Sequence, residues 1–166
     1  MLNFFTKKNL YMMNNPFEIT SPLDGRIIEL KKVSDPAFSS LSLGKGIAIV
    51  PQSNILVSPI SGTITALFPT FHAFGIQSDE GIEVLVHIGI DTVNLNGKGF
   101  KSFVKQGQYI NKGDKMIDVD FDYIKKQGLD TTTMIVITNH QKYHLNITSN
   151  QIVKKNDALI FIEEKC

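Results

Sequence analysis

The sequence predicts an all-β protein, an antiparallel β-sandwich with very little helix. Two observations lead to this class. Beyond the first 15 residues, the apolar residues fall into short alternating or continuous runs that are separated by Gly, Pro, Asn and Asp, which is the pattern of strands and turns. In addition, two sequence frames recur in the same order, which is typical of a fold built from two similar halves.

The predicted elements follow the chain in short segments bounded by turn residues. The strands are expected at 25–30, 46–50, 62–68, 71–77, 82–90, 115–119, 134–138 and 158–162. Only the segment 122–127, with Gly128 after it as a C-terminal cap, has the pattern of a short helix.

The repeats predict how these strands are arranged. The frame S-P-x-x-G-x-I-x-x-L at 21–30 recurs at 58–67, and a second frame at 108–117 recurs at 151–160. At the turn of the second frame, the first copy has Gly113 and the second copy has Asn156 at the matching position. Gly and Asn are the two residue types that best tolerate a left-handed backbone. We expect a duplicated hairpin-like unit whose two apolar faces pack together with pseudo-two-fold symmetry.

Composition and charge exclude several classes of protein. With 166 residues and 42% hydrophobic residues, the chain is long and apolar enough to fold, and we expect one domain over 16–166. The formal charge of +1 gives no bulk field for binding nucleic acid, so no nucleic-acid partner is expected. The single cysteine, Cys166, fits a reducing compartment, and no apolar run approaches the roughly 18 residues of a membrane span. A cytoplasmic protein is the expectation.

The first 15 residues follow another pattern. On a helical wheel their apolar side chains share one arc, formed by Met1, Leu2, Phe5, Met12 and Met13. This pattern predicts a tail that could form an amphipathic helix on a membrane surface or on a partner. A frayed tail in free solution is the alternative, because isolated helices of this length are marginal in water.

The side chains best placed for chemistry are His72 and His87. Two predicted strands flank a four-residue turn that ends in Gly, which is the pattern of a β-hairpin. If Gln77 and Ile82 close the turn, His72 lies directly opposite His87, with Cβ atoms roughly 4.5–5.5 Å apart and both rings on one face of the sheet. Alternation along the second strand then turns the valines toward the core and His87 outward.

Two converging imidazoles have three reasonable uses. They can form a nucleophile with a hydrogen-bonding helper, bind a metal, or be a cross-strand pair without chemistry. Two histidines are one short of the three protein ligands of a catalytic zinc, so a metal would need a carboxylate from elsewhere. The remaining pair, His140 and His144, lies in a polar stretch and is expected at the surface.

The hairpin also carries a resemblance to a known family. Residues 81–93, G-I-E-V-L-V-H-I-G-I-D-T-V, resemble the phosphorylation-site signature of the glucose family of EIIA phosphocarriers in the bacterial phosphoenolpyruvate:sugar phosphotransferase system. Residues 68–74, F-P-T-F-H-A-F, are similar to the family's second histidine motif, and the similarity extends over 19–162. The resemblance implies a barrel-sandwich hybrid fold and a phosphoryl carrier, a transferase component that requires no cofactor.

The resemblance also implies roles for individual residues. His87 would accept the phosphoryl group from phospho-HPr as a tele-phosphohistidine and pass it to the EIIB domain of an EIICB sugar permease. His72 would stabilise the transferred phosphate and Thr70 would orient His72, and a regulatory Zn²⁺ could bridge the two histidines with a partner carboxylate. The implied partner surface consists of Asp35, Ala37, Phe38, Leu43, Phe68, Phe74, Leu85, Asp91 and Val93.

Further partners follow from the same resemblance. They are regulatory targets: permeases, glycerol kinase and adenylate cyclase. The protein is also expected to associate weakly with the membrane through its tail, and to lie at the membrane periphery when it engages the permease.

Two other classes of protein stay open. A zinc hydrolase on a related sandwich needs a His-x-His pair, whereas position 89 is Gly. A lipoyl or biotinyl carrier module needs a modifiable Lys at a hairpin tip, whereas residues 78–81 are S-D-E-G.

Overall fold

The computed structural model describes residues 15–166, so the predictions for the tail concern residues that, apart from Asn15, lie outside the described part. Strands dominate the described chain, and the all-β class is confirmed. The strands are β1 (Glu18–Thr20), β2 (Gly25–Glu29), β3 (Lys45–Pro51), β4 (Ile55–Val57), β5 (Gly62–Leu67), β6 (Ala73–Gln77), β7 (Glu83–Ile88), β8 (Phe100–Ser102), β9 (Tyr109–Ile110), β10 (Lys115–Val119), β11 (Thr133–Ile137), β12 (Tyr143–Ile147), β13 (Ile152–Val153) and β14 (Ala158–Glu164). The helical turns are η1 (Leu30–Lys32), α2 (Pro36–Ser39), η2 (Thr92–Leu95), α3 (Phe121–Lys126) and η3 (His140–Lys142).

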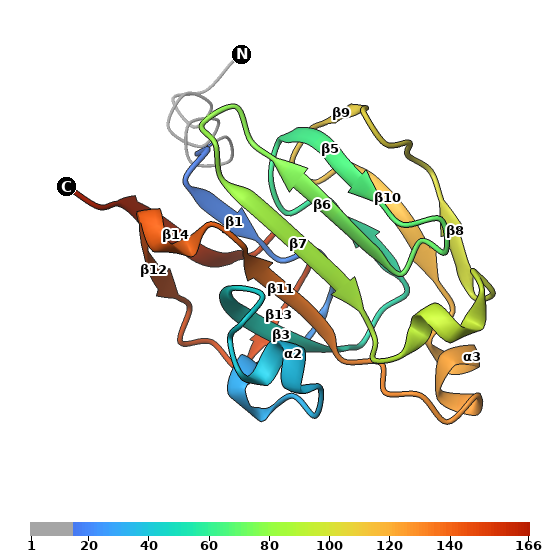
Figure 1. Ribbon diagram of the computed structural model, residues 1–166. Coiled ribbons are helices and arrows are strands. Elements are labelled where there is room, and N and C mark those ends of the chain that lie inside the picture. The colour runs from blue at the N-terminus through green and yellow to red at the C-terminus, as the bar shows by residue number, and fades with distance from the viewer. Residues whose placement is uncertain (1–14) are drawn as a thin grey trace, which may run out of the picture.

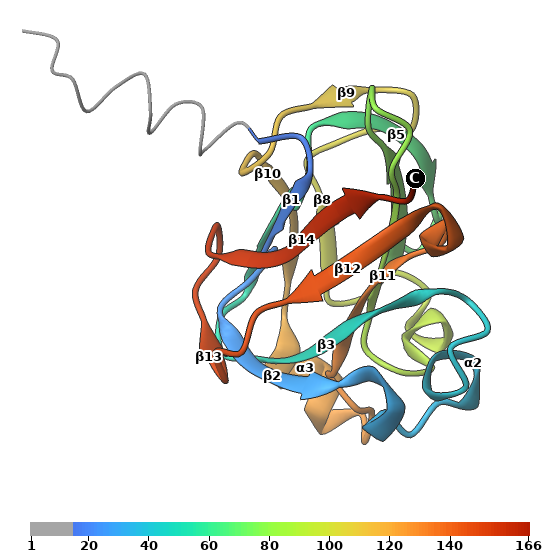
Figure 2. The ribbon, with the colours of Figure 1, turned by 90° about the vertical axis from the view of Figure 1, so that its left-hand side faces the viewer.

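The strands form one long sheet and two short ones. The long sheet has the order β13-β2-β3-β11-β7-β6-β5-β9, and the short sheets have the orders β1-β14-β12 and β4-β10-β8. Strands β6, β7 and β11 cross the face seen in Figure 1, and a turn of 90° in Figure 2 brings β14 and β12 to the front. The described strand pairs are antiparallel, as the sequence predicts.

The predicted duplication is visible in matching hydrogen bonds. The buried Ser21 hydroxyl donates to the carbonyl of Leu23 at 2.6 Å, and the buried Ser58 hydroxyl donates to the carbonyl of Ile60 at the same distance. In the second frame, Gly113 and Asn156 both adopt left-handed backbone, with φ of 90° and 75°. Because both turns need a left-handed backbone, the matching positions are occupied by Gly and Asn, which tolerate this conformation.

The two copies also bind each other through the main chain. The N–H of Val57 donates to the carbonyl of Pro22 at 2.9 Å, and the N–H of Thr20 donates to the carbonyl of Pro59 at 3.0 Å. Thr20 and Pro22 in the first copy correspond to Val57 and Pro59 in the second, so exchanging the two copies turns one bond into the other. The pseudo-two-fold sandwich predicted from the repeats is therefore confirmed.

Two hydrophobic clusters lie on opposite sides of the long sheet. The larger cluster fills the sandwich and takes its residues from most of the strands. The smaller one covers the outer face and consists of Leu30, Val33, Phe38, Ala48, Ile90, Met134 and Val136. Helix α2 covers this second cluster; Asp35 caps its N-terminus by accepting from the N–H of Ala37 at 3.0 Å, and Pro36 occupies the first turn.

The structure adds elements that the sequence pattern does not predict. The eight predicted strands and the helix at 122–127 are present with shifted ends, whereas β1, β4, β8, β9, β12, β13 and α2 are additional. Most of these are two to four residues long, which is too short for a periodic pattern to emerge. Among the described residues, the structure has no helix long and apolar enough to cross a membrane.

The matching serines give a test of the duplicated frame. Replacing Ser21 or Ser58 by Ala leaves a buried carbonyl without its hydroxyl donor, and each change is expected to lower the free energy of unfolding by about 1–2 kcal/mol. Urea denaturation measures this effect, with replacement of the exposed Ser34 by Ala as the control. Equal unfolding midpoints for the buried and exposed variants would contradict the structural role of the frame.

Candidate functional site

The hairpin of β6 and β7 brings His72 and His87 together, but in a different register from the predicted one. Gln77 pairs with Glu83, so Ala73 rather than His72 lies opposite His87. The loop contains one more residue than expected, Ile82. Its N–H donates to the Ser78 hydroxyl at 3.0 Å, and its carbonyl accepts from the N–H of Ser78 at 2.9 Å. The prediction of a directly opposed pair is therefore wrong.

The two rings meet nevertheless, with centroids 5.0 Å apart and planes at 78°. His72 precedes the first residue of β6, and Phe71 before it adopts a left-handed backbone with φ of 60°. This turn frees His72 from the alternation of the strand, while its carbonyl still accepts from the N–H of Ile88 at 2.7 Å. The predicted convergence of the imidazoles is confirmed, by a backbone turn rather than by strand register.

A backbone carbonyl fixes the ring of His87. The Nδ1 atom of His87 lies 2.8 Å from the carbonyl oxygen of Gly89. Because a carbonyl oxygen only accepts hydrogen bonds, Nδ1 carries the proton in the neutral ring and the lone pair is left on Nε2. Sequence reasoning missed this contact, since a main-chain acceptor leaves no signature in the residue types.

A buried hydroxyl holds the backbone next to Gly89. Thr92 is fully buried and its hydroxyl donates to the carbonyl of Ile88 at 2.5 Å. Gly89 has φ of 74°, and a Cβ atom there would lie 2.5 Å from the γ-methyl group of Thr92. A larger residue at position 89 would therefore displace the turn that holds His87. The role of Thr92 was not predicted either.

The second imidazole is held by a side chain, as the resemblance implies. The hydroxyl oxygen of Thr70 lies 2.5 Å from Nδ1 of His72. Thr70 belongs to the turn before β6. The hydroxyl can donate to Nδ1 or accept from it, so this bond allows the His72 proton to lie on Nε2.

Burial keeps both rings neutral. His72 is only 3% exposed, and desolvation, followed by the effect of nearby His87, lowers its pKa to about 4. Desolvation also lowers the pKa of His87, against the raising effects of the Gly89 carbonyl, Asp35 and Asp91. At neutral pH the site therefore offers two neutral imidazoles, of which half-buried His87 is the more accessible.

Two aromatic side chains frame the pair. Phe38 of α2 packs on His87 with ring centroids 5.1 Å apart, and Phe68 packs edge-on against His72 at 5.3 Å. Phe38 is 2% exposed because it also belongs to the second hydrophobic cluster, whereas Phe68 is 43% exposed. Each ring therefore limits the rotation of one imidazole.

The structure separates the residues of the expected partner surface into three groups. Exposed members are Ala37, Leu43, Phe68, Asp91 and Val93. Half-buried members are Asp35 and Leu85. Phe38 and Phe74 are buried, which corrects the expectation that both lie on the partner surface. Phe38 belongs to the second hydrophobic cluster, and β6 turns Phe74 inward, where it is a residue of the larger cluster.

The other two histidines lie apart from this pair. His144 is exposed on β12 and His140 is partly exposed in η3, as expected. Within residues 15–166, no group of three or more His, Cys, Asp or Glu side chains is arranged to hold a metal ion. The pair of His72 and His87, with ring centroids 5.0 Å apart, offers two ligands and no third.

Fold and site together define a duplicated β-sandwich with a paired-histidine centre. The profile of the family described as phosphoenolpyruvate-dependent sugar phosphotransferase system, EIIA 1, matches residues 17–143. The chain belongs to this family, as its two histidine motifs predict. It is thus a phosphocarrier component of a sugar phosphotransferase system.

Similar proteins agree with this assignment. The chain is 45% identical to the glucose-specific EIIA component of Buchnera aphidicola, over 98% of this chain and 97% of the relative. It is 48% identical to the beta-glucoside-specific EIIBCA component of Halalkalibacterium halodurans, over 86% of this chain but only 23% of that longer relative. The solved glucose permease IIA of Mycoplasma capricolum superimposes with a TM-score of 0.83 at 43% identity, covering 86% of this chain and 93% of that one.

Burial of His72 gives a pH-dependent test. The unfolded chain binds a proton at His72 near pH 6.5 and the folded chain only near pH 4, so the free energy of unfolding falls as the pH is lowered between these values. The full loss from this residue is on the order of 3 kcal/mol. Urea denaturation across this range should show a smaller loss for the His72→Gln variant than for the parent. Equal losses in both proteins would contradict a buried neutral His72.

Proposed function

We propose that His87 carries the phosphoryl group on Nε2, taking it from phospho-HPr and giving it to the EIIB domain of a sugar permease. The observation that carries this proposal is the bond between Nδ1 of His87 and the Gly89 carbonyl, which leaves Nε2 as the free lone pair of a neutral, half-buried ring. A neutral imidazole nitrogen is a competent nucleophile near pH 7.

The transfer exchanges one N–P bond for another. The Nε2 lone pair of His87 attacks phosphorus in line, the N–P bond of the donor breaks, and its electron pair returns to the donor imidazole. The proton of His87 stays on Nδ1, where it donates to the Gly89 carbonyl throughout, so the step needs no proton transfer. In the second step a cysteine thiolate of EIIB attacks phosphorus, the N–P bond of His87 breaks, and its electron pair returns to Nε2.

His72 acts as the helper in this proposal. With the Thr70 hydroxyl donating to Nδ1, the Nε2–H of His72 is free to donate to a phosphoryl oxygen between the two rings. Burial explains why the roles do not interchange. A phosphohistidine adds roughly two negative charges, which a residue 3% exposed cannot keep hydrated.

The partners fit the surroundings of the pair. Asp35 and Asp91 place negative charge near His87, and exposed Phe68 and Val93 provide apolar contact area, a combination suited to a basic partner with an apolar patch. EIIA parts lie in one polypeptide with EIIB and EIIC parts in relatives such as the beta-glucoside-specific EIIBCA components, which supports EIIB as the acceptor.

Zinc is a second, regulatory proposal for the same atoms. The two Nε2 atoms could bind Zn²⁺ together with a carboxylate from a partner, because the described part of the chain supplies no third ligand. His72 would then take its other tautomer, in which Nδ1–H donates to the Thr70 hydroxyl and Nε2 has the lone pair. Metal binding at Nε2 would occupy the lone pair used for phosphoryl transfer. Bound zinc and phosphorylation would therefore exclude each other.

Replacing His87 by Gln removes the proposed nucleophile, and no phosphorylation is expected with phosphoenolpyruvate, the general phosphotransferase enzyme and HPr. Intact-mass measurement detects the added phosphoryl group, with His140→Gln as a matched control that is expected to behave like the parent. A phosphorylated His87→Gln protein would overturn the assignment.

Replacing His72 by Gln removes the proposed donor to the phosphoryl oxygens but leaves His87 in place. This variant should still become phosphorylated, while transfer to EIIB slows by roughly 10²–10³-fold. Rapid-quench kinetics of transfer from the phosphorylated variant measures this. Unchanged transfer would show that His72 is only a packing residue.

A further inference from the structure

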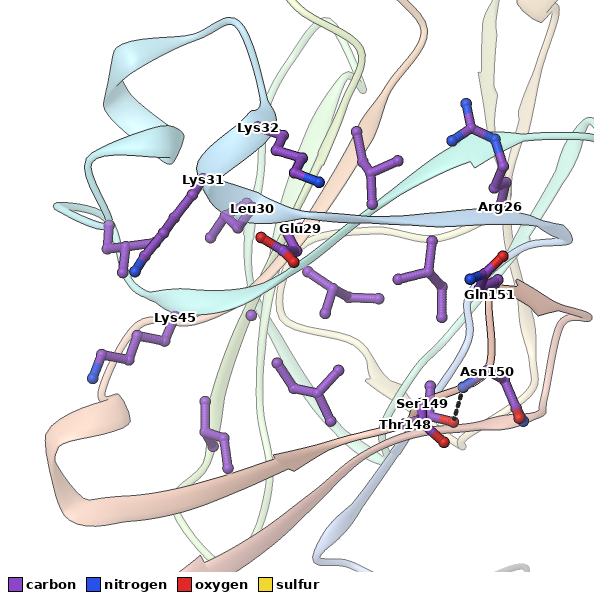
Figure 3. A pocket seen from close by; sticks show the side chains of 17 residues that line it. Arg26, Glu29, Leu30, Lys31, Lys32, Lys45, Thr148, Ser149, Asn150 and Gln151 are labelled. Carbon is purple, nitrogen blue, oxygen red and sulfur yellow. Dashed lines mark hydrogen bonds between the residues drawn. The ribbon is translucent and has the colours of Figure 1, made fainter.

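A groove with a cavity volume of about 930 Å³ lies between β2, β3 and β12 (Figure 3). Lys31 and Lys45 lie at one end of it, and the loop from Thr148 to Gln151 closes the other. No step of the phosphoryl transfer uses this groove. Its size is that of a binding site for a small ligand or a short peptide.

The groove is separate from the histidine pair. His87 pairs with Met134, Met134 with Ala48, and Ala48 with Ile28, which lines the groove. Three steps between neighbouring strands, at about 4.8 Å each, put roughly 14 Å between Ile28 and His87. An occupant of the groove would therefore leave the imidazoles free.

Apolar side chains line much of the groove. Ile28 and Leu41 come from the margin of the second hydrophobic cluster, and Leu145 and Ile147 come from β12. Ile147 is 43% exposed although it belongs to a strand of the sandwich. An occupant with apolar side chains would remove this surface from water.

Positive charge surrounds this apolar surface. The basic residues are Arg26, Lys31, Lys32 and Lys45, and all four side chains are exposed. Glu29 is the only acidic residue that lines the groove, and the one salt bridge found within residues 15–166 involves none of these side chains. The chain as a whole carries only +1, so the cluster is a local feature.

A strand edge is also available here. β12 is the last strand of its sheet and pairs only with β14 among the described strands. β2 pairs with β13 only at Gly25 and Arg26, so its later residues lack a partner strand on that side. Edge strands bind extended peptides by adding a strand, with pockets for alternate side chains.

We propose that this groove binds an extended acidic segment of a partner protein, which adds as a strand along β12. The apolar side chains of the segment face the groove, and its carboxylates meet the lysines at the open end. An extended segment of about five to seven residues, at roughly 3.3 Å each, runs the length of the wall that β2 and η1 form. The concave shape favours such a segment over a lipid surface, which would need the apolar residues on a flat or convex face.

Fluorescence anisotropy with a short labelled peptide of alternating Val and Glu tests the proposal on the full chain. The double variant Lys31→Glu, Lys45→Glu should bind at least about tenfold more weakly, because two favourable charge contacts become repulsive. The matched control is Lys105→Glu, Lys126→Glu, which makes the same charge change at exposed positions away from the groove and should bind like the parent. Circular dichroism verifies that both variants are folded.

Three further probes separate the alternatives. A peptide with Lys in place of Glu, and a Val/Glu peptide N-methylated at alternate amides, should both lose binding if charge and strand addition are required. Vesicles containing phosphatidylglycerol should not bind in a way that depends on Lys31 and Lys45. Equal binding of the acidic and basic peptides, an equal effect of the control variant, or vesicle binding without peptide binding would overturn the proposal.

Discussion

A neutral imidazole has a free lone pair on only one of its two nitrogens, and the main chain decides which one in His87. The Nδ1–H of His87 donates to the carbonyl of Gly89, which leaves the lone pair of the neutral ring on Nε2. That carbonyl depends on a left-handed turn at Gly89, packed against buried Thr92. The chemistry of the site thus rests on a backbone conformation that tolerates only glycine without strain.

The two imidazoles differ in the way that their proposed roles require. His72 is almost fully buried and tied to Thr70, whereas His87 is half-buried and lies near two carboxylates. Burial lowers both pKa values and therefore keeps both rings neutral at physiological pH. One ring can then act as a nucleophile and the other as a hydrogen-bond donor, without strong activation of either.

The outer hydrophobic cluster connects the surroundings of the site to the rest of the long sheet. Phe38 contacts His87 on one side and belongs to this cluster on the other, while Ile28 and Leu41 pack against the same cluster at the margin of the basic groove. The duplicated sandwich alone does not need α2, which covers only the outer face. The helix and its cluster are therefore additions that shape the two surfaces of the chain suited to partners.

The sequence by itself determined the all-β class, the duplication, the family and the identity of the paired histidines. These properties depend on local patterns and on motifs that survive in the order of residues, such as the two S-P-x-x-G-x-I frames. Only the tertiary structure decided the hairpin register, the core position of Phe74, the short strands and the Gly89 contact. The reason is physical. The hairpin register depends on how the loop closes, through the bonds between Ser78 and Ile82. A main-chain acceptor or a free strand edge is defined by contacts that residue types do not reveal.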